Sequence, residues 1–301
     1  MLTLRDVELR DRDFVNAKLK ERSGRNCELC FGNIFIWRGV YDIQIADYAD
    51  FQDILLVRME DDEGEYFLAP AGTGDMAKAI AEVTAYFAAK GQPPRFNYVA
   101  EEDVPLIEAA APGQFTATHL RDTDDYIHLT ESLATLSGKL FHGKRGHIKR
   151  FESTYYHEYV SLTPEYIPAA LELSETWCKQ HAFSDNEEEG YDFCATKQLL
   201  TNFDELHAIG GAILVHGQMA GYSAGTPRYP GSDDFVVHLE KGLIQYEGIY
   251  SIVNHLFMRD IMERGFKYAN REEDMGVPGL RKSKLSYNPE LVLPKYNLSG
   301  R

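Results

Sequence analysis

Two stretches of this sequence repeat the same succession of patterns, and this repeat constrains the fold more than any other feature. Residues 65–105 and 234–278 each contain a short apolar strand, a glycine-bearing turn, a helix and a second strand written F-x-Y-x, followed by E-E-D and V-P. A single match at an offset near half the chain indicates domain duplication, because solenoids repeat every ~20–50 residues. The sequence therefore predicts two copies of one α/β fold, at 1–150 and 151–301. The corresponding residues are Phe96, Tyr98, Glu102 and Asp103 in the first copy and Phe266, Tyr268, Glu273 and Asp274 in the second.

The second copy predicts a βαβ unit. Residues 235–237 form a β-branched and aromatic strand, apolar residues recur at helical spacing from Ile249 to Ile261, and Gly265 ends the helix before a second strand. Such a unit places its strands parallel, with the helix over one face, and ligands gather where the strands end and the helix begins. The polar residues expected at this edge are Glu240, Gln245, Glu247, Asn270, Glu272 and Asp274, followed by a basic loop with Arg281, Lys282 and Lys284.

Charge and hydropathy exclude several classes of protein. The 301 residues carry a net charge of −16, which argues against general DNA binding, because binding along the phosphate backbone needs dense Lys and Arg. No apolar run reaches the roughly 18–20 residues of a membrane span, and the N-terminus is charged where a signal peptide is apolar. We therefore expect a cytoplasmic protein without a membrane span.

Cysteine and histidine spacing gives little support for a metal. The sequence has one C-x-x-C pair without a second pair, and its histidines show no ligand spacing. We expect ordinary thiols and no zinc. The residues concerned are Cys27, Cys30, Cys178 and Cys194, with His216, His238 and His255.

A predicted helix at 131–150 reverses the sign of the charge locally. Its second half has no acidic residue and carries Lys139, His142, Lys144, Arg145, His147, Lys149 and Arg150. Such a surface suits phosphates of a nucleotide, a lipid headgroup or RNA, with Lys144 and Arg145 as substrate-binding candidates. The alternative is a solvated interdomain helix whose cations pair with nearby carboxylates.

The order of elements from residue 164 onward looks like the GNAT acyltransferase fold. The segments NREEDMGVPGLRKSKLSYNP, FHGKRGHIKRF and WR-x-x-YDIQI further resemble a bacterial family related to the C-terminal catalytic part of phosphatidylglycerol lysyltransferases. The resemblance covers essentially the whole chain. It implies two tandem GNAT-like domains, each a mixed, mostly antiparallel sheet flanked by helices. This architecture is also similar to the Fem peptidyltransferases, which move an amino acid from aminoacyl-tRNA to an amine.

The sequence departs from these relatives in two ways. Full lysyltransferases carry a large membrane-embedded segment before this domain, and this sequence does not contain one, which weakens the expectation of a lipid acceptor. CoA-using GNAT enzymes have the pyrophosphate loop Q/R-x-x-G-x-G/A, whereas residues 245–250 read QYEGIY. Tyr250 replaces the second glycine, and Glu247 would repel a pyrophosphate. CoA binding in the standard manner is therefore weakened.

Acyl transfer needs a group that takes a proton from the nucleophile. Glu240 and Glu247 are candidate bases, and Asp274 or Glu272 could hold the cationic amine of an amino acid. The alternative for Glu247 is structural, because a helix dipole alone favours a glutamate at the N-terminus by ~0.3–1 kcal/mol. Gln245 and Asn270 complete the substrate-binding set at this edge.

The basic loop suits a phosphate, the 3′ end of tRNA or a carboxylate, through Arg281, Lys282 and Lys284. The alternative is charge pairing with residues 272–274. The resemblance to GNAT enzymes further implies that Tyr287 protonates a leaving group, and its alternative is a core aromatic.

Three hypotheses for the function remain open. The first is an aminoacyl or acyl transferase that uses aminoacyl-tRNA or another activated donor and an amine or hydroxyl acceptor. The second is a CoA-dependent N-acetyltransferase with acyl-CoA as its cofactor. The third is a binding protein for an anionic small molecule or a lipid headgroup, in which neutralising Glu240, Glu247 and Asp274 would leave binding intact.

Overall fold

The chain divides into two compact units in the computed structural model, which describes residues 2–22, 24–46, 53–181 and 187–301. Unit 1 comprises Met1–Asp125, Glu273–Arg281 and Val292–Arg301, and unit 2 comprises Tyr126–Glu272 and Lys282–Leu291. This division differs from the expected boundary at residue 150. Residues 126–150 belong to unit 2, and the end of the chain returns to unit 1, because the last strand pairs within the first sheet.

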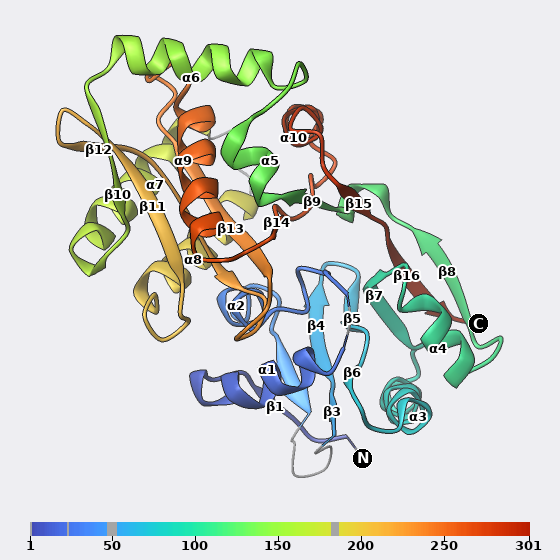
Figure 1. The fold of residues 1–301 in the computed structure, drawn as a ribbon. Coiled ribbons are helices and arrows are strands. Elements are labelled where there is room, and N and C mark those ends of the chain that lie inside the picture. The colour runs from blue at the N-terminus through green and yellow to red at the C-terminus, as the bar shows by residue number, and fades with distance from the viewer. Residues whose placement is uncertain (1, 23, 47–52, 182–186) are drawn as a thin grey trace. The chain divides into compact units, whose positions relative to one another are not determined.

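Unit 1 is built on a sheet with the strand order β1-β2-β4-β5-β7-β16-β8 (Figure 1). Its strands are β1 (Leu4–Asp6), β2 (Gln44–Ala46), β4 (Val57–Asp61), β5 (Gly64–Phe67), β7 (Arg95–Ala100), β8 (Phe115–His119) and β16 (Lys295–Gly300), and β3 (Ile54–Leu55) pairs separately with β6 (Ala71–Gly72). Its helices are α1 (Arg12–Lys20), α2 (Phe31–Ile36), α3 (Met76–Ala88) and α4 (Val104–Ala110). The apolar face of α3 packs Val83 and Phe87 into one core with Phe67 and Phe96 of the sheet.

Unit 2 contains the second sheet, with the order β10-β11-β12-β13-β14-β9-β15. The strands of this sheet are β10 (His157–Ser161), β11 (Ile209–Val215), β12 (Gln218–Pro227), β13 (Asp234–Gly242), β14 (Tyr268–Asn270), β9 (Asp125–Leu129) and β15 (Leu291–Leu293), with β9 next to β14. Its helices are α5 (Thr130–Thr135), α6 (His142–Thr154), α7 (Ile167–His181), α8 (Glu187–Thr201) and α9 (Ile249–Glu263), and α10 (Pro278–Leu285) ends in it. Helices α5, α6 and α9 share one apolar core with the sheet, and Figure 1 shows α9 lying along its face.

The structure confirms the predicted fold class. Each sheet is mixed and mostly antiparallel, and in each of them a helix connects two neighbouring parallel strands. In unit 2, Asp234 of β13 pairs in parallel with Tyr268 of β14, and α9 connects the two strands. In unit 1, Phe67 of β5 pairs in parallel with Phe96 of β7, and α3 connects them. The repeat in the sequence is therefore a repeat of βαβ units.

Two predicted elements were wrong. The helix expected at 131–150 is two helices, α5 and α6, because Leu136 and Gly138 adopt positive φ angles of 48° and 88° and end the first helix. The expected basic loop is the helix α10, which begins at Pro278, a residue whose fixed φ suits the first turn. No helix in the described part of the chain is both long and apolar enough to cross a lipid bilayer.

Two glycines let α9 approach the sheet closely where the helix begins. A Cβ on Gly221 of β12 would lie 2.8 Å from Ile249 Cγ1, and a Cβ on Gly242 of β13 would lie 2.9 Å from Ile249 Cγ2. Real Cβ atoms do not make such contacts without a shift of their neighbours. The absence of these two side chains therefore fixes the position of the α9 N-terminus against the strand ends.

We expect Gly221→Ala to destabilise the protein by about 1–3 kcal/mol, because the added methyl group overpacks the contact between α9 and β12. The matched control is Gly146→Ala in α6, where a Cβ meets nothing within 4 Å. Removing a glycine from a helix interior should stabilise it by ~0.5–1 kcal/mol. Urea unfolding followed by circular dichroism measures both. Equal effects of the two substitutions would contradict the close approach of α9.

Candidate active site

A cavity of about 300 Å³ lies at the N-terminus of α9 in unit 2. Residues 244 and 246–251 form one wall, and Lys144 and His147 of α6 contribute the other. Gly248 allows the two walls to meet, since its φ is +90° and a Cβ there would lie 2.8 Å from the His147 carbonyl oxygen. The cavity therefore occupies the edge at which the sequence predicts ligand binding.

Glu240 organises the polar residues at the end of β13. Its Oε1 accepts a hydrogen bond of 2.9 Å from Arg271 Nη2, and its Oε2 accepts one of 3.0 Å from Asn254 Nδ2. All three side chains are largely buried, with Asn254 fully so. One carboxylate thus joins β13, α9 and the segment that follows β14.

Two polar atoms of this cluster have no hydrogen-bond partner in the described part of the chain. They are Arg271 Nη1, a donor, and Asn254 Oδ1, an acceptor. A buried polar atom without a partner costs roughly 1–3 kcal/mol, so native proteins keep few of them outside functional sites. Arg271 Nη1 is thus available as a donor and Asn254 Oδ1 as an acceptor.

The ring of Tyr287 contacts two cations. Its ring centroid is 3.6 Å from Lys144 Nζ and 4.9 Å from the guanidinium carbon of Arg271. Burial raises the pKa of Tyr287 to about 12, so its hydroxyl keeps its proton near neutral pH. Tyr287 is a core aromatic, packed in the apolar cluster of unit 2.

Lys144 lines the cavity, is half-buried, and holds its Nζ over the Tyr287 ring. Burial lowers the pKa of Lys144 to about 8, and the positive charge of Arg271 adds to this effect while Glu240 opposes it. Titratable residues that line a cleft and have a strongly shifted pKa are candidates for functional residues. Lys144 thus has a fraction of neutral amine at physiological pH.

Glu247 lies in the cavity wall, but it is exposed and forms an ion pair of 2.5 Å with Arg150. The other predicted residues of unit 2 contact protein groups. Gln245 accepts a hydrogen bond from the Gln180 side chain, and Asn270 accepts one from the backbone N–H of Glu272. Glu272 contacts His238, while Lys284 and Arg145 donate hydrogen bonds to the backbone carbonyls of Arg271 and Gly138. Lys282 is exposed. Of the predicted residues, the structure brings Glu240, Tyr287 and Lys144 together.

Asp274 and Arg281 belong to unit 1 and pair with each other. Arg281 donates to both carboxylate oxygens of Asp274, at 2.7 and 2.8 Å, and also to Asp122. Asp274 is completely buried, and its equivalent in the first copy, Asp103, is likewise buried against Arg22. The two aspartates thus occupy the same structural position in the two repeats.

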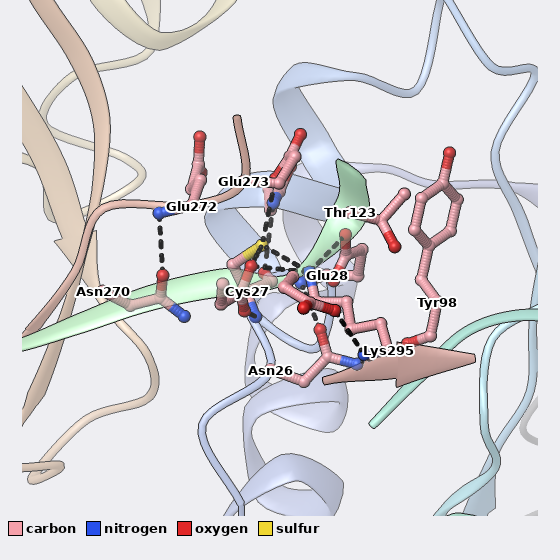
Figure 2. A network of polar contacts seen from close by, with 12 residues as sticks. Asn26, Cys27, Glu28, Tyr98, Thr123, Asn270, Glu272, Glu273 and Lys295 are labelled. Atoms are coloured by element: carbon pink, nitrogen blue, oxygen red, sulfur yellow. Dashed lines mark hydrogen bonds and ion pairs between the residues drawn. The ribbon is translucent and has the colours of Figure 1, made fainter. Parts of the chain in front are cut away.

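A second polar cluster lies in the interior of unit 1. Lys295 of β16 is completely buried, and its ammonium lies 2.6 Å from Glu28 Oε2, 2.6 Å from Asp125 Oδ1 and 3.4 Å from Cys27 Sγ. Figure 2 shows Lys295, Cys27 and Glu28 within one network of polar contacts. Burial alone would lower the pKa of Lys295, but Asp125 and the other acidic groups raise it, so the amine stays charged.

Cys27, Glu28 and Asp125 also form the group of potential metal ligands in the described residues, with ligand atoms within 4.8 Å of one another. The Lys295 ammonium already supplies a positive charge to them. Burial raises the pKa of the Cys27 thiol, which disfavours the thiolate that a metal requires. That the cysteines are ordinary thiols, and that the chain holds no zinc, stays a prediction.

Arg271 and Asn254 are the site residues that the sequence analysis missed. Arg271 directly follows β14, and Glu240 lies near the end of β13. Strands β13 and β14 are parallel. Because the ends of parallel strands meet at one edge, a carboxylate and a guanidinium at these places predict an ion pair. Asn254 gives no such signal, since it lies on an otherwise apolar face of α9.

Two mixed sheets, each with a parallel pair bridged by a helix, give the chain the tandem architecture that the sequence analysis predicts. The chain belongs to the phosphatidylglycerol lysyltransferase C-terminal family, which matches residues 20–299. This confirms the family that the sequence motifs resemble.

Three solved structures illustrate the relationship. A conserved protein of unknown function from Bacteroides thetaiotaomicron is 35% identical, with both chains covered completely and a TM-score of 0.93. L-PGS from Bacillus licheniformis is 18% identical over 96% of this chain and 92% of the other, with a TM-score of 0.68. FemX is 10% identical over 98% and 97%, with a TM-score of 0.58. Because L-PGS and FemX have such low identity to this chain, their similarity shows a shared fold alone. No protein with a curated description matches the chain.

The acidic cluster of unit 1 predicts a pH-dependent stability. Burial, together with Asp125 and Glu273, raises the pKa of Glu28 to about 8 against the opposing charge of Lys295. Between roughly pH 4.3 and pH 8 the folded state then keeps a proton that the unfolded state has lost. The free energy of unfolding should therefore fall as pH rises through this range, by up to ~1.4 kcal/mol per pH unit for this group.

Glu28→Gln should flatten this dependence, because the amide resembles the protonated acid and does not titrate. Urea unfolding at several pH values between 4.5 and 8 measures it, with Glu290→Gln as the control at an exposed position. If Glu28→Gln and Glu290→Gln give the same pH dependence as the unsubstituted chain, Glu28 titrates normally and the prediction fails.

Proposed function

We propose that this protein transfers an aminoacyl group from an activated donor, an aminoacyl-tRNA, to an amine or hydroxyl acceptor. The observation that carries the proposal is the cavity at the α9 N-terminus, with Lys144 in its wall and the Glu240 cluster beside Tyr287. Its volume of about 300 Å³ is at the lower end of the range for small-molecule sites. Membership in a lysyltransferase family supports aminoacyl transfer as the reaction class.

The residues supply what the reaction needs. Transfer forms a tetrahedral centre whose oxygen becomes negative, and fixed positive groups stabilise it. Arg271 is a buried cation with a free donor, and Asn254 offers an acceptor to an amino or hydroxyl group. Because Glu240 fixes both side chains, they need not reorganise during the reaction. The basic residues along α6 would attract the phosphates of the donor.

Purified protein incubated with radiolabelled aminoacyl-tRNAs should move the label to one of a panel of acceptors: phosphatidylglycerol vesicles, diamines and lysine-containing peptides. Arg271→Met should lower the transfer rate by about 10²–10³-fold, the effect of losing one preorganised donor. Exposed Glu158→Gln serves as the control for a change of charge in the same unit. The proposal fails if the unsubstituted protein transfers nothing from any charged tRNA.

The CoA-dependent alternative makes a different prediction. The loop at 245–250 keeps Gly248, but the His147 carbonyl oxygen of α6 lies against it on the side where a Cβ would point. A pyrophosphate needs open backbone N–H groups at a helix N-terminus. The contact with α6, together with Glu247, disfavours this mode.

Calorimetric titration with acetyl-CoA at low and moderate salt should therefore show no saturable binding. Tyr250→Gly, which restores the glycine pattern of the loop, should not create it, because α6 still lies against Gly248. Saturable binding to the unsubstituted protein would place the CoA-dependent hypothesis ahead of aminoacyl-tRNA.

A further inference from the structure

Lys144 differs from the other cations of α6 in its surroundings. It lines the cavity and is half-buried, whereas Arg145, Lys149 and Arg150 are exposed. Its Nζ stands 3.6 Å from the centroid of the Tyr287 ring, a contact that fixes the amine at the cavity wall. A cation that only attracts phosphates has no need of such burial.

Several charged or titratable groups surround Lys144. Arg271 lies 4.9 Å from the same Tyr287 ring, and Glu240 accepts a hydrogen bond from Arg271. Among the described residues, the charged or titratable groups around the amine and the cavity are His147 from α6, Tyr246 and Glu247 from the loop, Tyr250 from α9, Glu240 from β13, Arg271 after β14 and Tyr287 after α10. Burial and Arg271 both act against the ammonium form, and their combined effect gives Lys144 a pKa of about 8.

The other candidate bases of this site are less suitable. Both carboxylate oxygens of Glu240 already accept hydrogen bonds, and exposed Glu247 is paired with Arg150. The Tyr287 hydroxyl keeps its proton at neutral pH, because its pKa is about 12. A general base works best when its pKa lies near the operating pH. At pH 7, roughly a tenth of an amine with a pKa near 8 is neutral.

We propose that Lys144 is the proton-transfer residue of the aminoacyl transfer, an inference that rests on the proposed function. Its neutral Nζ takes the proton from the acceptor N–H or O–H while the acceptor atom bonds to the carbonyl carbon of the donor ester. The resulting ammonium then gives this proton to the leaving oxygen as the C–O bond of the donor breaks. The proton is conserved, so the step needs no further reactant.

Direct titration of Lys144 tests the first half of this inference without any substrate. Reductive methylation of the full chain with ¹³C-formaldehyde labels its lysines, and the carbon shifts are followed from pH 6 to 11. Loss of one signal in Lys144→Arg assigns the residue, and exposed Lys149 on the same helix is the internal comparison. We expect Lys144 to titrate at least one pH unit below Lys149. Titration together with Lys149 would overturn the inference and leave the proposed function untouched.

The pH dependence of transfer tests the second half. With aminoacyl-tRNA and the acceptor panel described above, the rate should rise with pH and level off above about pH 8, because the neutral amine is the active form. Lys144→Arg keeps the charge but cannot release its proton, so it should lower the rate by about 10²-fold and abolish this inflection. Lys197→Arg, at an exposed position of α8, should leave both the rate and the inflection unchanged.

His147→Gln tests the other titratable side chain that α6 contributes to the cavity. If the inflection disappears in His147→Gln and persists in Lys144→Arg, the histidine is the base and the inference is overturned. An absence of transfer by the unsubstituted protein overturns the proposed function instead, and with it the proton-transfer role, whatever the titration of Lys144 gives.

Discussion

The hydrogen bonds of Glu240 with Arg271 and Asn254 hold together the edge of unit 2 at which β13 ends and α9 begins. One buried carboxylate joins the end of β13, the first half of α9 and the segment after β14. Removing one partner of such a pair leaves an uncompensated charge in the interior, which costs about 3–5 kcal/mol. The charge environment of Lys144 also depends on this contact, because the positive charge of Arg271 lowers the pKa of Lys144 and Glu240 opposes it. The packing at this edge and the pKa of Lys144 therefore depend on the same few atoms.

The βαβ units could be predicted because their signals are local. The spacing from Ile249 to Ile261 gave α9, and the strand pattern at 235–237 gave β13, so Glu240 and the α9 N-terminus fell at the correct edge. Tyr287 and Lys144 joined this site only through packing of α6 and α10, which no periodicity encodes. The break between α5 and α6 was missed because Leu136, a good helix former, adopts a left-handed conformation there.

Long-range pairing explains why the sequence did not predict the interior of unit 1. Cys27 looked like half of a C-x-x-C motif, yet its sulfur lies beside Lys295, 268 residues further along the chain. Asp274 was predicted as a site carboxylate, and it follows an F-x-Y-x strand just as Asp103 does in the first copy. Their arginine partners, Arg281 and Arg22, indicate that the repeat preserves a structural ion pair. Residue type alone cannot distinguish such a carboxylate from a catalytic one.

The return of β16 to the first sheet has a consequence for biosynthesis. This strand lies between β7 and β8, and it carries the buried Lys295. A ribosome makes the chain from the N-terminus at ~5–20 residues per second, so β7 and β8 emerge long before their partner exists. Until then they present unpaired edges, which are open to association with other chains. The sheet of unit 1 therefore cannot be completed until β16 has left the ribosome.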